Sequence, residues 1–268
     1  MAKEIIIDHS NFRDHISPIV NGEMCSRGCI PRNYDVQPRP MEAVEFPLIP
    51  RSEWSSRIAG MVATQSRLSD LRLYGNGGRT IPSLNQNGQG YCWAYSTTMS
   101  VMMLRLRSGS PYVPLSAHAV ACKIKNFADE GAWGALSMDF ISKVGVPSQA
   151  KWPQGSMDRS LDTPETWEDA KKYRITQEWA DLDAPVYNRD MTFAQVMTLL
   201  LNRIPVVADF DWWSHSICLI DPVEVEPGSF GVRLINSWGD GWSDRGMGVL
   251  RGDQAVPDNA VAPRIVTA

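Results

Sequence analysis

The sequence predicts an α+β protein of two packed lobes, because helix patterns fill its first part and strand patterns its last part. Apolar residues recur at helical spacing in several segments between residues 52 and 202. From residue 205 onward the pattern changes to short β-type runs separated by glycine, proline and aspartate. This segregation is typical of α+β folds, and a cleft between the lobes is the natural place for a functional site.

The composition is that of a globular protein of moderate charge. The chain has 268 residues, 43% of them hydrophobic, and a net charge of −4. Its basic residues are scattered, so we expect no nucleic-acid partner. The first residues contain a three-residue apolar run, Ile5–Ile7, which is too short for a signal peptide or a membrane span. We therefore expect no membrane partner and a cytoplasmic or virion-associated protein.

Residues 1–50 differ from the rest, because six prolines interrupt any periodicity. They are expected to form an extended arm that lies along the main domain or binds an assembly partner. His9, His15, Cys25 and Cys29 could be read as a zinc cluster, but their order and gaps match no zinc module, so we expect no metal and no cofactor. The five cysteines are too few and too irregular for a disulfide framework, so reduced thiols are expected.

The main domain is predicted to span residues 51–268, with a helical lobe at about 85–180 and a β lobe at about 185–255. Ser116 is expected to cap a helix that contains His118, a solvent-side or core residue. Thr192 and Gln195 form a potential capping box for a helix over 193–202. The other expected helices are one or two over 52–73, 93–108, 133–144 before Gly145, and one from Thr163 through 172; the expected strands are 205–210, 215–220, 230–235 and 247–251.

Cys92 is a candidate nucleophile because of its position in the stretch QNGQGYCWAYS, residues 86–96. Gly88 and Gly90 allow a tight backbone path, and the cysteine then opens the helix over 93–108. The positive end of a helix dipole, together with a nearby histidine, lowers the pKa of a thiol toward the reactive thiolate. The alternative is a buried structural cysteine, which is the commoner fate of this residue type.

The rest of the chain supplies partners for such a thiol. Among the four histidines, His215 lies at the edge of an apolar strand and could act as base and acid. Asn236 ends the next strand and could orient the imidazole, with Trp238 keeping water from their hydrogen bond. Gln86 and the backbone N–H of Cys92 could stabilise negative charge on an attacked carbonyl.

These blocks resemble the papain-like cysteine peptidases. The stretch over 86–96 is similar to the family's block from the oxyanion glutamine to the active-site cysteine, with Gly90 and Trp93 in place. Leu115–Ser116, His215–Ile217 and LINSWGDGWSDRGMGVLRG over 234–252 match further blocks in the same order. The resemblance covers about 52–252. It implies a helical lobe and a β-barrel-like lobe, a peptide or protein substrate, and catalysis by Cys92, His215, Asn236 and Gln86.

The sequence also departs from the family pattern. Gln89 stands where secreted members have a cysteine, and Asp129–Gly131 stands near the place of the Gly-Gly stretch that binds substrate backbone. The arm shows no recognisable family propeptide. A thiol peptidase is the main hypothesis, and related acyl chemistries on the same constellation stay open. The alternative is a structural or interaction protein on a papain-like scaffold, such as a virion or assembly component.

Overall fold

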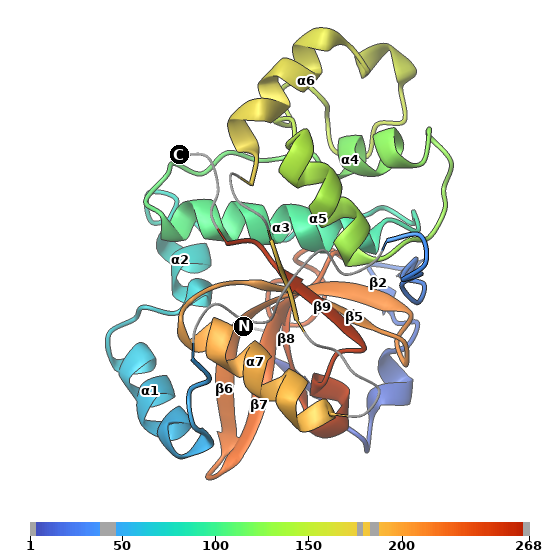
Figure 1. Ribbon diagram of the computed structural model, residues 1–268. Helices are drawn as coiled ribbons and strands as arrows, with labels where there is room; N and C mark the ends of the chain where they lie inside the picture. The colour runs from blue at the N-terminus through green and yellow to red at the C-terminus, as the bar shows by residue number, and fades with distance from the viewer. Residues whose placement is uncertain (1–3, 38–46, 176–178, 183–187, 265–268) are drawn as a thin grey trace.

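The computed structural model describes residues 4–37, 47–175, 179–182 and 188–264, and it has the predicted α+β architecture. A group of helices packs on one side of a large sheet, with further helices on the other side (Figure 1). The α-helices are α1 (Arg51–Ala63), α2 (Leu68–Tyr74), α3 (Cys92–Arg107), α4 (Ala117–Ile124), α5 (Gly134–Lys143), α6 (Pro164–Ala170) and α7 (Arg189–Leu201). Short 3₁₀ helices span Phe12–His15, Arg159–Leu161, Lys171–Tyr173 and Gly252–Ala255.

The described strands of the β lobe form one open seven-stranded sheet in the order β1-β8-β7-β6-β5-β9-β4. Neighbouring strands run antiparallel except at the edge, where β1 pairs with β8 in parallel. The strands are β1 (Ile5–Ile7), β4 (Ala180–Asp181), β5 (Val206–Phe210), β6 (His215–Glu226), β7 (Ser229–Ile235), β8 (Met247–Arg251) and β9 (Asn259–Ala262). A separate hairpin consists of β2 (Ile19–Val20) and β3 (Glu23–Met24).

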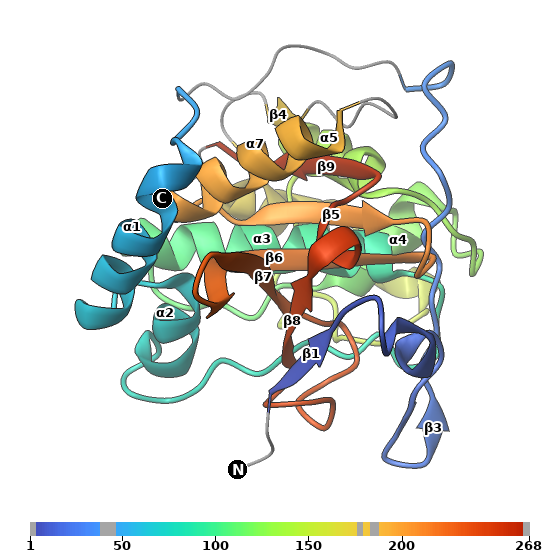
Figure 2. The same cartoon turned by 90° about the horizontal axis from the view of Figure 1, so that it is seen from below.

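Strand β6 divides the hydrophobic core into two, because successive side chains of a strand point to opposite faces of its sheet. Cys218 and Ile220 face a core built around α3, which lies along β6 and β5 (Figure 2). Ile217 and Leu219 face a second core covered by α1 and α7. Helix α3 is therefore enclosed between the sheet and the other helices, and its residues from Cys92 to Leu106 are all buried.

The helix caps predicted at Ser116 and Thr163 are confirmed, whereas no side chain among the described residues caps α1, α3 or α5. The Ser116 hydroxyl accepts a hydrogen bond from the Ala119 N–H at 3.3 Å, as an N-cap does. The capping box proposed at Thr192 is wrong, because α7 begins at Arg189, four residues before the predicted start at residue 193. The Asn188 side chain caps it by accepting from the Met191 N–H at 3.0 Å, and the Thr192 hydroxyl instead bonds back to the Asn188 carbonyl inside the helix.

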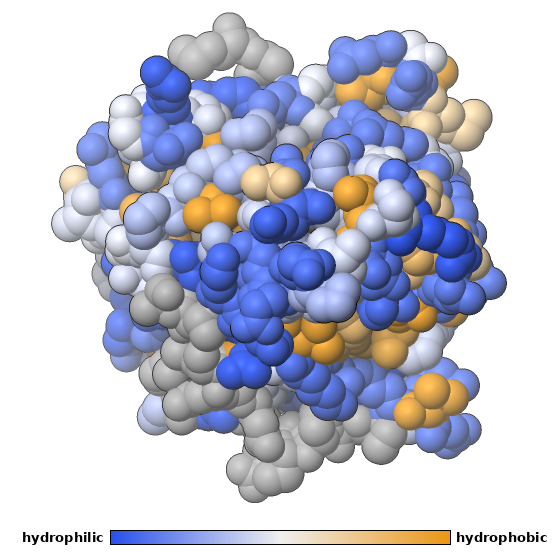
Figure 3. Space-filling model, turned by 90° about the horizontal axis from the view of Figure 1, so that it is seen from above, coloured by the Kyte–Doolittle hydropathy of each residue, from blue (hydrophilic) through white to orange (hydrophobic). Residues whose placement is uncertain are grey.

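The N-terminal arm, residues 1–50, is attached to the main domain over the part that the structure describes. Strand β1 extends the sheet beside β8, and the β2–β3 hairpin turns at Asn21 and Gly22, which have φ values of 51° and 85°. Residues 38–46 lie outside the described ranges. No helix in the described part is both long and apolar enough to cross a membrane. The face in Figure 3 is largely hydrophilic with small hydrophobic patches.

Candidate active site

Cys92 is the first residue of α3 and lies where this helix meets the sheet. Its side chain is completely buried. The backbone N–H groups of Ser216 and Gly28 point at its sulfur and favour the thiolate, but burial outweighs them and raises the pKa of Cys92 to about 12. The sequence predicted a lowered thiol pKa from the helix dipole. Burial of the sulfur opposes that effect and raises the pKa instead.

His215 and Asn236 are brought together by adjacent strands, with His215 opening β6 and Asn236 following the end of β7. His215 Nε2 lies 2.8 Å from Asn236 Oδ1. An amide oxygen can only accept, so Nε2 carries the proton and Nδ1 is left as the basic nitrogen. Among the described residues Nδ1 has no hydrogen-bond partner. The N–H of the next residue, Ser216, points at the Cys92 sulfur, so the start of β6 lies against this thiol.

Two features hold the His215 imidazole neutral and fixed. Its side chain is completely buried, which lowers its pKa to about 4, although the bond to Asn236 acts in the opposite direction. The Trp238 ring stacks on the imidazole with a centroid distance of 4.6 Å and an interplanar angle of 22°. The Trp238 ring therefore covers one face of the imidazole.

Gln86 is held in position by the residue that follows Asn236. The Ser237 hydroxyl donates to Gln86 Oε1 at 2.5 Å, and the Gln86 backbone N–H donates to the Ser237 carbonyl at 2.9 Å. These bonds direct Gln86 Nε2 away from Ser237. Trp93 Nε1 donates to the Gly90 carbonyl at 3.0 Å and so braces the loop in front of Cys92. His215, Asn236 and Trp238 are thus in contact with one another, Gln86 is joined to them through Ser237, and Trp93 and Gly90 flank Cys92.

The arm passes through this place as an extended segment, residues 26–30, called here the cleft segment. The Ser26 carbonyl accepts hydrogen bonds from Gln86 Nε2 at 3.1 Å and from Trp238 Nε1 at 2.9 Å. The Gly28 carbonyl accepts from the Ala132 N–H at 3.0 Å, and the Ile30 N–H donates to the Ala132 carbonyl at 3.0 Å. The segment is thus held in an extended conformation, with one isolated parallel bridge between Cys29 and Ala132.

Gly28 is the point of closest approach. A Cβ atom added there would lie 1.9 Å from the Gly90 carbonyl oxygen, a distance that no side chain tolerates. The three nearest atoms are all backbone atoms of Gly90, so no side-chain movement relieves the clash. The residue over the nucleophile has to be glycine for the cleft segment to occupy its position.

Sequence reasoning missed the residues that bind the cleft segment. Ala132 acts through backbone N–H and C=O groups, which carry no side-chain signal. Ser214 likewise accepts from the Cys29 N–H through its carbonyl, at 3.1 Å. Ser237 could have been found, because it directly follows Asn236 and carries a hydroxyl.

The described residues contain no group of three or more histidine, cysteine, aspartate or glutamate side chains arranged to hold a metal ion. The five cysteines are free thiols. His118 is a core residue, with Nδ1 at 2.9 Å from the Tyr95 hydroxyl. The chemistry that this site offers is therefore that of a thiol, an imidazole and amide donors.

Comparison with known proteins relates this architecture to one class, the papain-like cysteine proteases. Procathepsin L2 proteinase from the larval midgut of Tenebrio molitor has a TM-score of 0.63 at 16% identity, over 90% of this chain and 78% of that chain. Xylellain, a cysteine protease from Xylella fastidiosa, has a TM-score of 0.61 at 16% identity, over 90% of this chain and 97% of that chain. The fold is therefore papain-like.

The sequence comparison points to the same class. Cathepsin K of Mus musculus is 23% identical over 207 residues, which cover 69% of this chain and 60% of cathepsin K, so the match spans less than two thirds of that relative. No family model matches the chain. The resemblance to papain-like cysteine peptidases is confirmed by these relatives.

Proposed function

We propose that the chain is a thiol-dependent peptidase whose site is covered by its own arm. The observation that carries the proposal is the His215–Asn236 pair at 2.8 Å, which leaves the basic Nδ1 without a hydrogen-bond partner among the described residues, while the N–H of the next residue, Ser216, points at the Cys92 sulfur. A nucleophile, a base and a group that orients the base are the three parts that acyl transfer requires. The papain-like fold of the neighbours supports the same reaction class.

The role of each residue in peptide hydrolysis follows from the atoms that it has available for proton transfer or hydrogen bonding. Once the site opens, the Cys92 thiol gives its proton to His215 Nδ1, and the sulfur attacks a peptide carbonyl. The negative charge that forms on the carbonyl oxygen is stabilised by Gln86 Nε2 and the Cys92 backbone N–H. His215 then protonates the leaving amine, and water hydrolyses the thioester with His215 as base. Asn236 Oδ1 holds the imidazole throughout by accepting from Nε2.

The direction of the cleft segment explains how it can lie on the nucleophile without being a substrate. Its Ser26 carbonyl occupies the Gln86 donor, and the residues after Ser26 pair with Ala132. By the family resemblance, the backbone near residue 131 binds the substrate residues on the N-terminal side of the attacked carbonyl. In the cleft segment, the residues that pair there are on the C-terminal side of Ser26. The cleft segment therefore runs opposite to a substrate, and it must move out before a peptide can bind.

The experiment is hydrolysis of a denatured protein by the full chain carrying Gly28→Val, because the clash at Gly28 displaces the cleft segment. We expect cleavage into peptides under reducing conditions. The same chain with an added Cys92→Ala substitution is the matched control and is expected to be inactive. Circular dichroism of both proteins checks that the fold is kept.

The second candidate is a structural or interaction protein on the papain-like scaffold. It is favoured by the filled cleft and by the completely buried Cys92 and His215. The same experiment separates the two functions. A folded Gly28→Val chain that neither cleaves protein nor reacts with an epoxysuccinyl peptide supports the scaffold function and contradicts the peptidase.

A further inference from the structure

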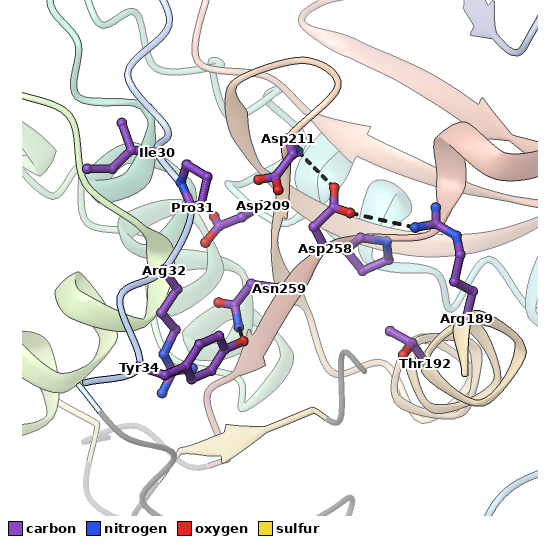
Figure 4. A pocket seen from close by; sticks show the side chains of 11 residues that line it. Ile30, Pro31, Arg32, Tyr34, Arg189, Thr192, Asp209, Asp211, Asp258 and Asn259 are labelled. Atoms are coloured by element: carbon purple, nitrogen blue, oxygen red, sulfur yellow. Dashed lines mark hydrogen bonds and ion pairs between the residues drawn. The ribbon is translucent and has the colours of Figure 1, made fainter. Parts of the chain in front are cut away.

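Beside the cleft segment lies an acidic pocket of about 190 Å³. Figure 4 shows Asp209, Asp211 and Asp258 on one side of it and the arm residues Ile30–Arg32 on the other. One further guanidinium, that of Arg189, lines the pocket, at 3.6 Å from Asp258. The main domain thus contributes three carboxylates and one cation to the pocket, which is a net negative charge. The arm adds a second cation, Arg32.

Asp209 is the carboxylate of this pocket nearest to the catalytic residues. It lies in β5, and its partner across the ladder to β6 is Ser216, the residue next to His215. Its side chain is buried, with 3% of the residue exposed. Asp209 Oδ2 accepts from the Gly134 N–H at 2.9 Å, and Oδ1 has no hydrogen bond of normal geometry among the described residues. The Ser216 hydroxyl and the Cys29 thiol nevertheless lie close enough to this carboxylate to lower its pKa.

The cleft segment places one particular side chain against this carboxylate. Cys29 is the residue whose backbone bridges to Ala132 and whose N–H donates to Ser214. Its thiol lies against the Asp209 carboxylate, and burial together with that negative charge raises the pKa of Cys29 well above its usual value. The Gly28 backbone lies over the Cys92 sulfur. Cys29, the next residue of the extended segment, is the one whose side chain reaches Asp209.

The arm also brings a cation to this region. Arg32 forms a 2.8 Å ion pair with Asp181, and both side chains are completely buried. Burial raises the pKa of Asp209 to about 6, and hydrogen bonds from Ser216, Gly134 and Cys29, followed by the positive charge of Arg32, act in the opposite direction. When the arm leaves, both carboxylates lose this cation. A buried carboxylate without a cation is unfavourable, so a ligand that restores positive charge is favoured.

We propose that Asp209 selects substrates by charge at the place where the Cys29 side chain now lies. The substrate residue bound there is the one just before the residue whose carbonyl is attacked, and Asp209 favours lysine or arginine at that position. The inference rests on the proposed peptidase function. An extended substrate that pairs with Ala132 puts that residue where Cys29 lies now. Its ammonium or guanidinium group then donates to Asp209 Oδ1 and replaces the charge that Arg32 supplies in the covered state.

The test uses the full chain carrying Gly28→Val and four fluorogenic amides, acetyl-Xaa-Gly-aminomethylcoumarin, with Xaa as arginine, lysine, leucine or glutamate. We expect kcat/KM for arginine and lysine to exceed that for leucine by about tenfold or more, which corresponds to one charge-assisted hydrogen bond. Glutamate is expected to be the poorest. A leucine substrate that equals or exceeds arginine overturns the proposal.

Two substitutions at the same position separate charge from shape. Asp209→Asn is expected to reduce the arginine-to-leucine ratio to near one, whereas Asp209→Glu keeps the charge and keeps a ratio above one. Thermal unfolding checks each variant. If Asp209→Asn does not fold, the arginine-to-leucine ratio of kcat/KM in the Gly28→Val chain still tests whether the site prefers a basic residue. An unchanged ratio in a folded Asp209→Asn chain contradicts the assignment of Asp209.

Failure of the inference can be told from failure of the peptidase function. If the Gly28→Val chain reacts with an epoxysuccinyl peptide and cleaves all four amides without a basic preference, the peptidase stands and the subsite proposal is wrong. If it neither reacts nor cleaves any amide, both are wrong.

Discussion

The Ser26 carbonyl oxygen lies 3.1 Å from the Gln86 amide nitrogen, the donor that would otherwise meet an attacked carbonyl. One group of the arm thus uses the hydrogen-bonding capacity that catalysis needs. The same carbonyl also accepts from Trp238 Nε1 at 2.9 Å. Under the proposed function, binding of the arm and binding of a substrate are therefore mutually exclusive.

Trp238→Phe should loosen the arm while keeping an aromatic ring on His215. The substitution removes the Nε1 hydrogen bond to the Ser26 carbonyl, worth about 1 kcal/mol, and so should raise the open fraction about fivefold. The rate of Cys92 alkylation in the full chain measures this fraction. Gln86→Ala in parallel also releases Ser26, but it should lower peptide cleavage. A rate in Trp238→Phe equal to that of the wild-type chain would show that this bond does not hold the arm.

His215→Ala and Asn236→Ala should differ in size when both are made in the Gly28→Val chain. His215 performs the proton transfers, so its removal should lower kcat/KM by about 10³-fold. Asn236 orients the imidazole through one hydrogen bond, so its removal should cost about tenfold. Steady-state cleavage of a fluorogenic peptide gives both values. Equal or reversed effects would contradict the assigned roles.

His118 should make the stability of the fold sensitive to acid. Burial lowers the pKa of His118 from 6.5 to about 4, so the unfolded chain binds a proton that the folded chain does not as the pH falls below 6.5. The folded state should therefore lose about 2 kcal/mol between pH 8 and pH 5 through this residue. Urea unfolding of the wild-type chain and His118→Gln at both pH values measures the difference. If the two proteins lose equal stability, His118 is not the cause.

Much of this site could be predicted because catalysis needs particular side chains in a particular order. Cys92 before a long helix, His215 opening a strand and Asn236 ending the next one are visible as residue types at the ends of periodic segments. Strand β8 was predicted with its exact limits, because alternation and a preceding glycine frame it. Strand β9 was missed, since it has four residues, Asn259–Ala262, in which alanines dilute the β signal.

The covering of the site could not be predicted, because it depends on backbone contacts over long sequence separations. Gly28 is one glycine among 20, and its requirement arises from the Gly90 carbonyl, which lies far away in sequence. The Ala132 backbone binds the cleft segment without any special side chain. The pKa of Cys92 is raised for the same reason, since the helix dipole is visible in the sequence but the burial that opposes it is not.

The central claim is that an intact thiol site lies beneath the cleft segment. Its most direct measurement is the rate at which an epoxysuccinyl peptide alkylates Cys92 in the full chain carrying Gly28→Val. The control is Gly60→Val, since a Cβ at Gly60 has no atom within 4 Å. We expect alkylation at least about tenfold faster in Gly28→Val than in the wild-type chain or Gly60→Val. A tenfold increase corresponds to a loss of about 1.4 kcal/mol in the free energy that holds the cleft segment in place. Equal rates in the three folded proteins would contradict the claim.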